Sequence, residues 1–113
     1  MTIKQTPVIG IIGGSGIYNI DGLTNTEWRK IDSSFGDPSD ELMFGKLGEQ
    51  EVVFLPRHGR GHFLPPNGIN YRANIDALKR VGVTDILSLS AVGSFRDDLA
   101  PGVFVIPDTR VEL

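Results

Sequence analysis

The amino-acid sequence predicts an α/β protein with a mixed, partly parallel β-sheet and flanking helices. Two apolar runs, at residues 7–12 and 84–89, are continuous rather than alternating, which is typical of strands buried on both faces of a sheet. A segment at residues 67–82 has the length and periodicity of a helix and precedes the second run. A crossover helix between strands indicates that part of the sheet is parallel.

The first half of the chain contains four predicted strands. The run at residues 7–12 leads directly into a glycine-rich stretch, and residues 27–34 alternate weakly and are predicted as a second strand. Residues 42–47 and 50–55 form a predicted hairpin whose turn is Gly48-Glu49.

The helix predicted at residues 67–82 has recognisable ends. Asn67 or Asn70 can cap its start, and Gly82 suits the left-handed residue that closes a helix. The apolar residues expected on its buried face are Tyr71, Ile75, Leu78 and Val81.

Two further strands are expected after the helix. Residues 84–89 form a buried strand, and residues 103–106 form another that follows the turn Pro101-Gly102. A parallel sheet needs cover on both faces, and one helix does not supply it. We therefore expect another part of the protein, or a partner, to provide the missing helices.

Composition excludes several classes of function. The chain has 113 residues, enough for a single domain, and a net charge of −3, which argues against a nucleic-acid surface. Cysteine is absent, so disulfides and thiolate metal sites are excluded. No membrane-spanning run or secretory signal is visible, and a cytoplasmic location is expected.

Gly13-Gly14-Ser15-Gly16 follows the first strand and is the first candidate site. Successive glycines let backbone N–H groups point into one concavity that binds anions, and Ser15 adds a hydroxyl donor. A tight turn without a ligand explains the same residues. A dinucleotide-binding module is opposed by Asn19, which stands where its fingerprint needs a third glycine.

The second candidate site, residues 56–62, follows the strand at 50–55. Arg57 and Arg60 can each offer a planar fork to phosphate, and His58 can donate a hydrogen bond. The alternative is a basic surface loop whose charges pair with acids; the available acids include Asp37, Asp40 and Glu41.

A metal site in this loop is disfavoured. His58 and His62 have the spacing of a helical zinc pair, but glycines at positions 59 and 61 oppose a helix. No carboxylate lies within the motif as a third ligand.

Residues 88–94 form a third candidate, because small residues and the Ser90 hydroxyl follow the strand at 84–89. If the three strands are neighbours, their ends converge and supply backbone amides, hydroxyls, a guanidinium and an imidazole. Such a set suits a free or terminal phosphate. Phosphate acting as a nucleophile needs positioning more than activation.

Together these motifs resemble the methylthioadenosine phosphorylase family of nucleoside phosphorylases. The resemblance implies a phosphorylase-type fold and phosphorolysis of 5'-methylthioadenosine to adenine and 5-methylthioribose 1-phosphate. It extends to about Asp108 and is carried by Ile9–Ile17, Phe35–Ser39, Arg57–His62, Asn70–Asn74, Ser90–Ser94 and Pro101-Gly102.

Carried over by motif position, the resemblance implies five phosphate contacts: Ser15, Arg57, His58, Ser90 and the backbone amide of Ala91. It implies no catalytic side chain, metal or cofactor, with inorganic phosphate as co-substrate. The expected partners are 5'-methylthioadenosine or a related purine nucleoside and, for the full-length family, two further copies in a homotrimer.

The resemblance also implies a truncated fold. Residues 1–108 are expected to be the amino-terminal part of a phosphorylase domain, and residues 109–113 a tail outside the family pattern. The purine- and ribose-binding residues of the family then lie outside this chain. The alternatives are a catalytically inactive fragment, or a parent enzyme acting on methylthioinosine or 6-oxopurine nucleosides.

Overall fold

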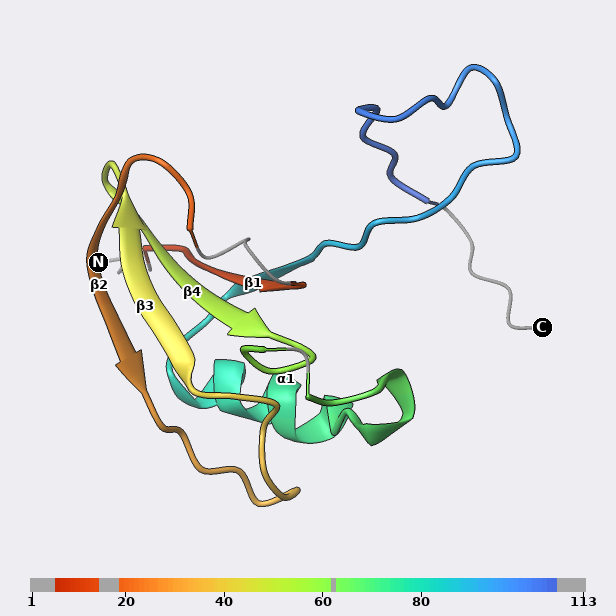
Figure 1. Ribbon diagram of the computed structural model, residues 1–113. Helices are drawn as coiled ribbons and strands as arrows, with labels where there is room; N and C mark the ends of the chain where they lie inside the picture. The colour runs from red at the N-terminus through yellow and green to blue at the C-terminus, as the bar shows by residue number, and fades with distance from the viewer. Residues whose placement is uncertain (1–5, 15–18, 62, 108–113) are drawn as a thin grey trace, which may run out of the picture.

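The computed structural model describes residues 6–14, 19–61 and 63–107. Within them the chain forms one five-stranded sheet, ordered β2-β3-β4-β1-β5, with a single α-helix against it (Figure 1). The elements in chain order are β1 (Val8–Gly13), β2 (Leu23–Arg29), β3 (Leu42–Leu47), β4 (Gln50–Pro56), a 3₁₀ turn (Pro66–Gly68), α1 (Tyr71–Arg80) and β5 (Asp85–Ser88).

The sheet is mixed, which confirms the predicted fold class. β1 lies between β4 and β5 and runs parallel to both. β3 runs antiparallel to β4 and to β2, so the predicted hairpin at residues 42–55 is also confirmed. β4 therefore joins the antiparallel and parallel halves of the sheet.

β4 carries the core because it is buried on both faces. Val53 and Leu55 belong to the cluster that packs against Leu78 of α1. Val52 and Phe54 point to the other face, where they form a second cluster, and Phe54 is only 1% exposed. This division follows from the alternation of side chains along a strand.

α1 is shorter than predicted, but its ends are as expected. Asn70 is the N-cap and accepts a 3.0 Å hydrogen bond at Oδ1 from the backbone N–H of Ala73. Gly82 follows the helix with φ at +90°, a conformation that favours glycine.

The predicted buried face of α1 is wrong in part. Leu78 is buried, but Tyr71 and Ile75 are 58% and 46% exposed. The helix instead turns its small residues toward the sheet: Ala73, Asn74 and Ala77 are buried. Small side chains let the helix lie close to the sheet, which gives dense packing. This accounts for the rotation of the helix away from the orientation that the sequence predicts.

The second predicted strand is displaced. β2 occupies residues 23–29 rather than 27–34, and its pairing with β3 shifts register between Thr24 and Glu27. Asn25 has φ at +54° within this irregularity. β2 is an edge strand of mostly exposed residues, so it lacks the alternation that would have marked its bounds.

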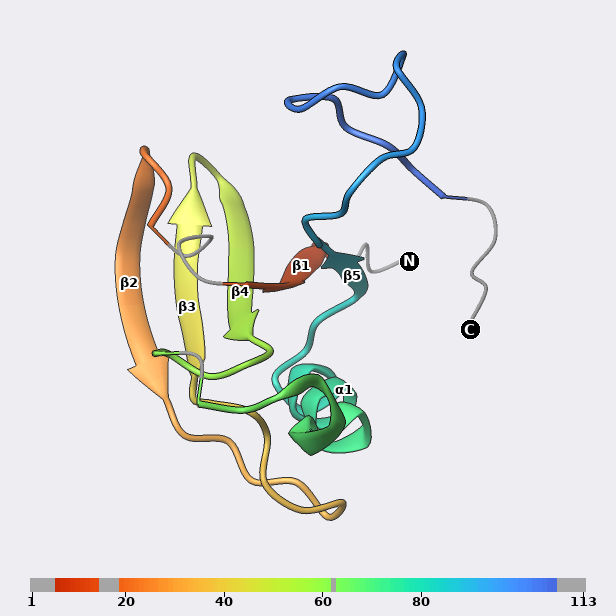
Figure 2. The same cartoon turned by 45° about the vertical axis from the view of Figure 1, so that its right-hand side comes forward.

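The part of the chain after α1 differs most from the expectation. β5 is exposed along its whole length rather than buried, and residues 103–106 form no strand. Residues 89–107 leave the sheet as an irregular excursion (Figure 2). Within the described residues nothing pairs with the outer edge of β5, so no ladder supports a further strand.

The excursion also expands the molecule. The radius of gyration is 15.5 Å, above the roughly 13 Å of a compact domain of this size. The described residues contain one α-helix, which lies on one face of the sheet. The sequence also predicts a single helix in this chain. That helix is too short and too polar to cross a membrane.

Candidate phosphate site at the strand ends

The three predicted motifs meet at one edge of the sheet. Because β4, β1 and β5 are adjacent and parallel, their carboxyl ends lie side by side. The ladders continue one residue past the strands: the N–H of Arg57 donates to the carbonyl oxygen of Gly13 at 3.0 Å, and that of Leu89 to Ile12 at 2.8 Å. The convergence of the three motifs therefore follows from the order and direction of these strands.

Arg57 joins the ends of β4 and β5. Its Nη1 donates a 2.5 Å hydrogen bond to the carbonyl oxygen of Leu89, the residue before Ser90. Arg57 is half-buried, whereas Ser90 and Ala91 are exposed. The guanidinium is thus bound to the backbone one residue before Ser90 and two before Ala91, whose hydroxyl and backbone amide are, like the guanidinium, donors for an anion.

The glycine-rich stretch after β1 is described only in part. Gly14 lies at the same edge, and a Cβ placed on it would meet no atom of the described residues within 4 Å. Packing against those residues therefore does not require glycine at this position. Ser15, which the sequence predicts as a phosphate contact, lies outside the described residues, as does His62.

His58 is oriented by the loop that carries it. Its Nδ1 lies 2.9 Å from the carbonyl oxygen of Leu64, and a carbonyl can only accept, so Nδ1 carries the hydrogen. The N–H of Leu64 in turn donates to the carbonyl oxygen of His58 at 3.0 Å. These two hydrogen bonds between His58 and Leu64 fix the orientation of the ring within the loop.

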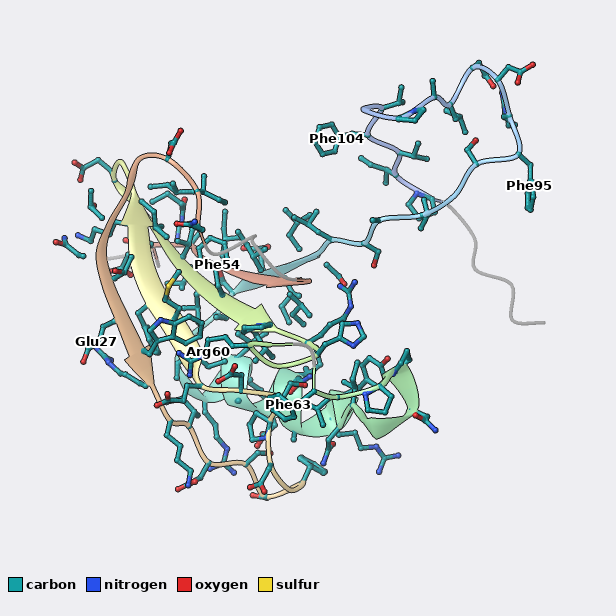
Figure 3. The ribbon with its side chains drawn as sticks, viewed as in Figure 1. Glu27, Phe54, Arg60, Phe63, Phe95 and Phe104 are labelled. Atoms are coloured by element: carbon teal, nitrogen blue, oxygen red, sulfur yellow. The ribbon has the colours of Figure 1, made fainter. Side chains whose placement is uncertain are left out.

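Arg60 does not join Arg57 at the strand ends. Its guanidinium binds both oxygens of Asp40 at 3.0 Å and Glu41 Oε1 at 3.0 Å. It also lies 3.8 Å from the centre of the Trp28 ring, a cation–π contact. Figure 3 shows Arg60 near the start of β3. The fork that the sequence offered to phosphate is occupied by acids, as the surface-loop alternative predicted for this residue.

Asp40 and Arg60 each stabilise the charged form of the other. Burial raises the pKa of the Asp40 carboxyl. Hydrogen bonds from the Arg60 side chain and backbone lower it by more than burial raises it, so the pKa lies below the ordinary value. The hydrogen bond to Asp40 raises the pKa of Arg60. The pair is therefore fully ionised at neutral pH.

Sequence reasoning missed three contributors to this region: Trp28, Leu64 and Asn74. Leu64 acts through its backbone, which no side-chain pattern reveals. Trp28 lies on an edge strand and Asn74 on a helix, both far from the loop in sequence. The only available signal was that the chain has a single tryptophan and that a polar residue occupies the buried side of a helix.

A hollow elsewhere does not belong to this site. A surface depression of about 310 Å³ is lined mainly by residues of β1 to β4, among them Val8 and Glu51 at the starts of β1 and β4. These are the amino ends of the parallel strands, the opposite end of the sheet from Arg57.

The fold is that of an α/β protein, and the carboxyl ends of its parallel strands carry hydrogen-bond donors suited to an anion. The model of the Phosphorylase superfamily matches residues 8–113, nearly the whole chain. The chain belongs to this superfamily.

Among proteins similar to it is an S-methyl-5'-thioadenosine phosphorylase from Rhodospirillum rubrum, 60% identical over 108 residues. The match covers 96% of this chain but 37% of that protein. The chain therefore spans little more than a third of the length of this relative.

Solved structures give the same result. A methylthioadenosine phosphorylase from an Antarctic soil metagenomic library is 50% identical, with a TM-score of 0.78 over 87% of this chain and 34% of its own. A variant of the Schistosoma mansoni adenosine/methylthioadenosine phosphorylase, in complex with adenine, is 48% identical, with a TM-score of 0.76 over 87% of this chain and 33% of its own. The predicted phosphorylase-type fold is confirmed.

Proposed function

We propose that this chain supplies the phosphate-binding edge of a nucleoside phosphorylase that converts 5'-methylthioadenosine and phosphate to adenine and 5-methylthioribose 1-phosphate. The observation that carries the proposal is the meeting of three parallel strand ends, where the Arg57 guanidinium binds the backbone beside Ser90. Relatives bearing that activity in their names support the substrate.

In this reaction a phosphate oxygen bonds to the anomeric carbon of the ribose while the carbon–nitrogen bond to the purine breaks. The electron pair of that bond leaves with the purine nitrogen, and the purine takes up a proton. Positive charge develops on the sugar, and a phosphate dianion held beside it stabilises that charge. The chain's task is to hold the phosphate in line.

Each proposed contact has a distinct role. The Arg57 guanidinium binds phosphate oxygens with N–H groups not used on Leu89, and the Ser90 hydroxyl and Ala91 amide donate from the neighbouring strand end. His58 is the further contact that the motif predicts, and the hydrogen bond between its Nδ1 and Leu64 fixes the orientation of its ring. Ser15 remains a contact proposed from the sequence alone.

The assay that tests the proposal is release of adenine from 5'-methylthioadenosine, followed by chromatography with and without phosphate. We expect the whole protein that contains this chain to release adenine in a phosphate-dependent reaction, equimolar with the sugar phosphate, and to lose this release in the Arg57→Ala variant. Methylthioinosine and inosine in parallel reactions decide the purine preference. Phosphate-independent release, or release that survives Arg57→Ala, contradicts the proposal.

The second candidate is a chain that binds phosphate without catalysing phosphorolysis. It is favoured by the exposure of β5 and by the irregular course of residues 89–107, which leave the sheet uncovered at that side. Calorimetric titration with phosphate separates the candidates: binding without adenine release selects this one. Assembly into a homotrimer and a cytoplasmic location belong to the proposal for the whole protein.

A further inference from the structure

Arg60 lies two residues after His58 and is flanked by glycines. Its side chain nevertheless binds residues of other segments. It contacts Asp40 and Glu41 from the connection before β3, and Trp28 from β2. Its backbone N–H also donates to Asp40 Oδ2 at 2.7 Å. One carboxylate therefore binds both the main chain and the side chain of this residue.

The carboxylate of Asp40 is itself held on a rigid element. The preceding residue, Ser39, is buried, and its N–H donates to Asn74 Oδ1 at 2.8 Å. Asn74 returns a 3.0 Å hydrogen bond from Nδ2 to the Ser39 hydroxyl. Asn74 is 2% exposed on α1, so this amide pair fixes the connection to the helix.

The backbone around Arg60 has little stiffness of its own. Gly59 and Gly61 flank it with φ at +76° and +85°, conformations that glycine adopts freely. Glycines on both sides make the position of this loop depend on the contacts of the residue between them. Those contacts are the carboxylates of Asp40 and Glu41 and the Trp28 ring.

We propose that Arg60 is a positioning residue: bound to Asp40 and stacked on Trp28, it holds residues 57–61 so that Arg57 and His58 stand at the phosphate site. The proposal rests on the phosphate-binding function proposed above. In this proposal the hydrogen bonds between Asn74 and Ser39 fix the backbone that carries Asp40.

The test compares Arg60→Gln and Asp40→Asn with Arg96→Gln as the matched control. Arg96 pairs with Asp98 on the surface, where both side chains are mostly exposed, and lies outside both segments. Phosphate affinity is measured by calorimetry, and amide hydrogen exchange is followed in residues 57–61. Thermal unfolding shows whether each variant is folded, and Arg60→Lys keeps the charge without the fork.

By analogy with residues that orient metal ligands, whose loss typically lowers affinity about 10- to 100-fold, we expect a loss of at least about tenfold in Arg60→Gln and in Asp40→Asn. Exchange in residues 57–61 accelerates in both variants and is unchanged in Arg96→Gln. In the double variant Arg60→Gln/Asp40→Asn, the loss of phosphate affinity is smaller than the sum of the two single losses, because the two substitutions share the contact between the side chains. The phosphate affinity of Arg60→Lys lies between that of the wild type and that of Arg60→Gln.

Two results would overturn the proposal: unchanged phosphate affinity in folded Arg60→Gln, or unchanged exchange in residues 57–61. Failure of the proposed function has a different signature, because the wild-type chain then binds no phosphate. In that case amide hydrogen exchange in residues 57–61 by itself tests the positioning role of Arg60. Acceleration in Arg60→Gln supports the positioning of the loop by Asp40, and its absence overturns it.

Discussion

The Nη1 atom of Arg57 donates a 2.5 Å hydrogen bond to the carbonyl oxygen of Leu89, a residue 32 positions further along the chain. The bond joins the ends of β4 and β5 across β1, which lies between them. It holds one edge of the guanidinium against the backbone that leads to Ser90. The orientation of this cation therefore depends on the pairing of three strands.

Replacing Arg57 with Ala is expected to abolish measurable phosphate binding. Hydrogen bonds to charged groups contribute about 1.5–3 kcal/mol each, and a guanidinium that makes two of them accounts for most of the affinity of a weak anion site. Calorimetry with inorganic phosphate measures the loss, and Arg96→Gln again serves as control. Phosphate affinity that survives Arg57→Ala would place the site elsewhere.

Acid is expected to loosen the contact between Arg60 and Trp28. The folded-state pKa of Asp40 lies below its ordinary value of 3.8, so the ion pair contributes stability above that pH and loses it as the pH falls through the lower, folded value. Fluorescence of Trp28, the only tryptophan, should be constant from neutral pH to about 5 and change below about pH 4.

The same acid titration has an internal comparison. Asp40→Asn removes the titrating carboxyl and should flatten the change, whereas Asp98→Asn, in an exposed pair, should leave it in place. A change of equal size in Asp40→Asn assigns the fluorescence response to another group.

Gly59→Ala is expected to destabilise the loop more than Gly61→Ala. Both positions have positive φ, which costs a non-glycine residue roughly 1–2 kcal/mol. A Cβ at position 59 would also meet the Phe63 ring, whereas at position 61 it would meet no atom of the described part of the chain within 4 Å. Thermal unfolding of the two variants separates the strain from the clash, and equal losses would mean that the exposed Phe63 ring simply moves aside.

Asn74→Ala is expected to cost about 1–3 kcal/mol of folding free energy, because it leaves the buried N–H of Ser39 without an acceptor. The exposed Asn67, replaced in the same way, should cost far less. Urea unfolding followed by circular dichroism measures both. Similar values for the two variants would indicate that water replaces the Asn74 amide.

Limited chymotrypsin digestion is expected to cut first at Phe95 and Phe104. Both side chains are fully exposed on the irregular segment at residues 89–107, where Figure 3 shows them standing away from the sheet. Phe54, in the middle of β4, should resist cleavage until the fold opens. Mass spectrometry of the early fragments is the measurement, and early cleavage at Phe54 would contradict the described core.

The sequence by itself determined the elements whose signal is local. The continuous apolar run of β1, the hairpin at Gly48-Glu49 and the presence of a capping asparagine before α1 depend on residues close together in the chain, although the choice of Asn70 over Asn67 came from the structure. Adjacent glycines, arginine and histidine after β4 likewise indicated an anion site without knowledge of the fold. Whether Ser15, Arg57, His58, Ser90 and Ala91 bind phosphate stays a prediction.

Only the tertiary structure decided which arginine stands at the strand ends and which binds acids. Arg57 and Arg60 are three residues apart and chemically identical, but the sheet places Leu89 beside the first, and the connection fixed by Asn74 places Asp40 beside the second. It also decided that residues 103–106 form no strand, although their composition favours one. A strand needs a neighbour to pair with, and that neighbour is a property of the assembled sheet rather than of any local segment.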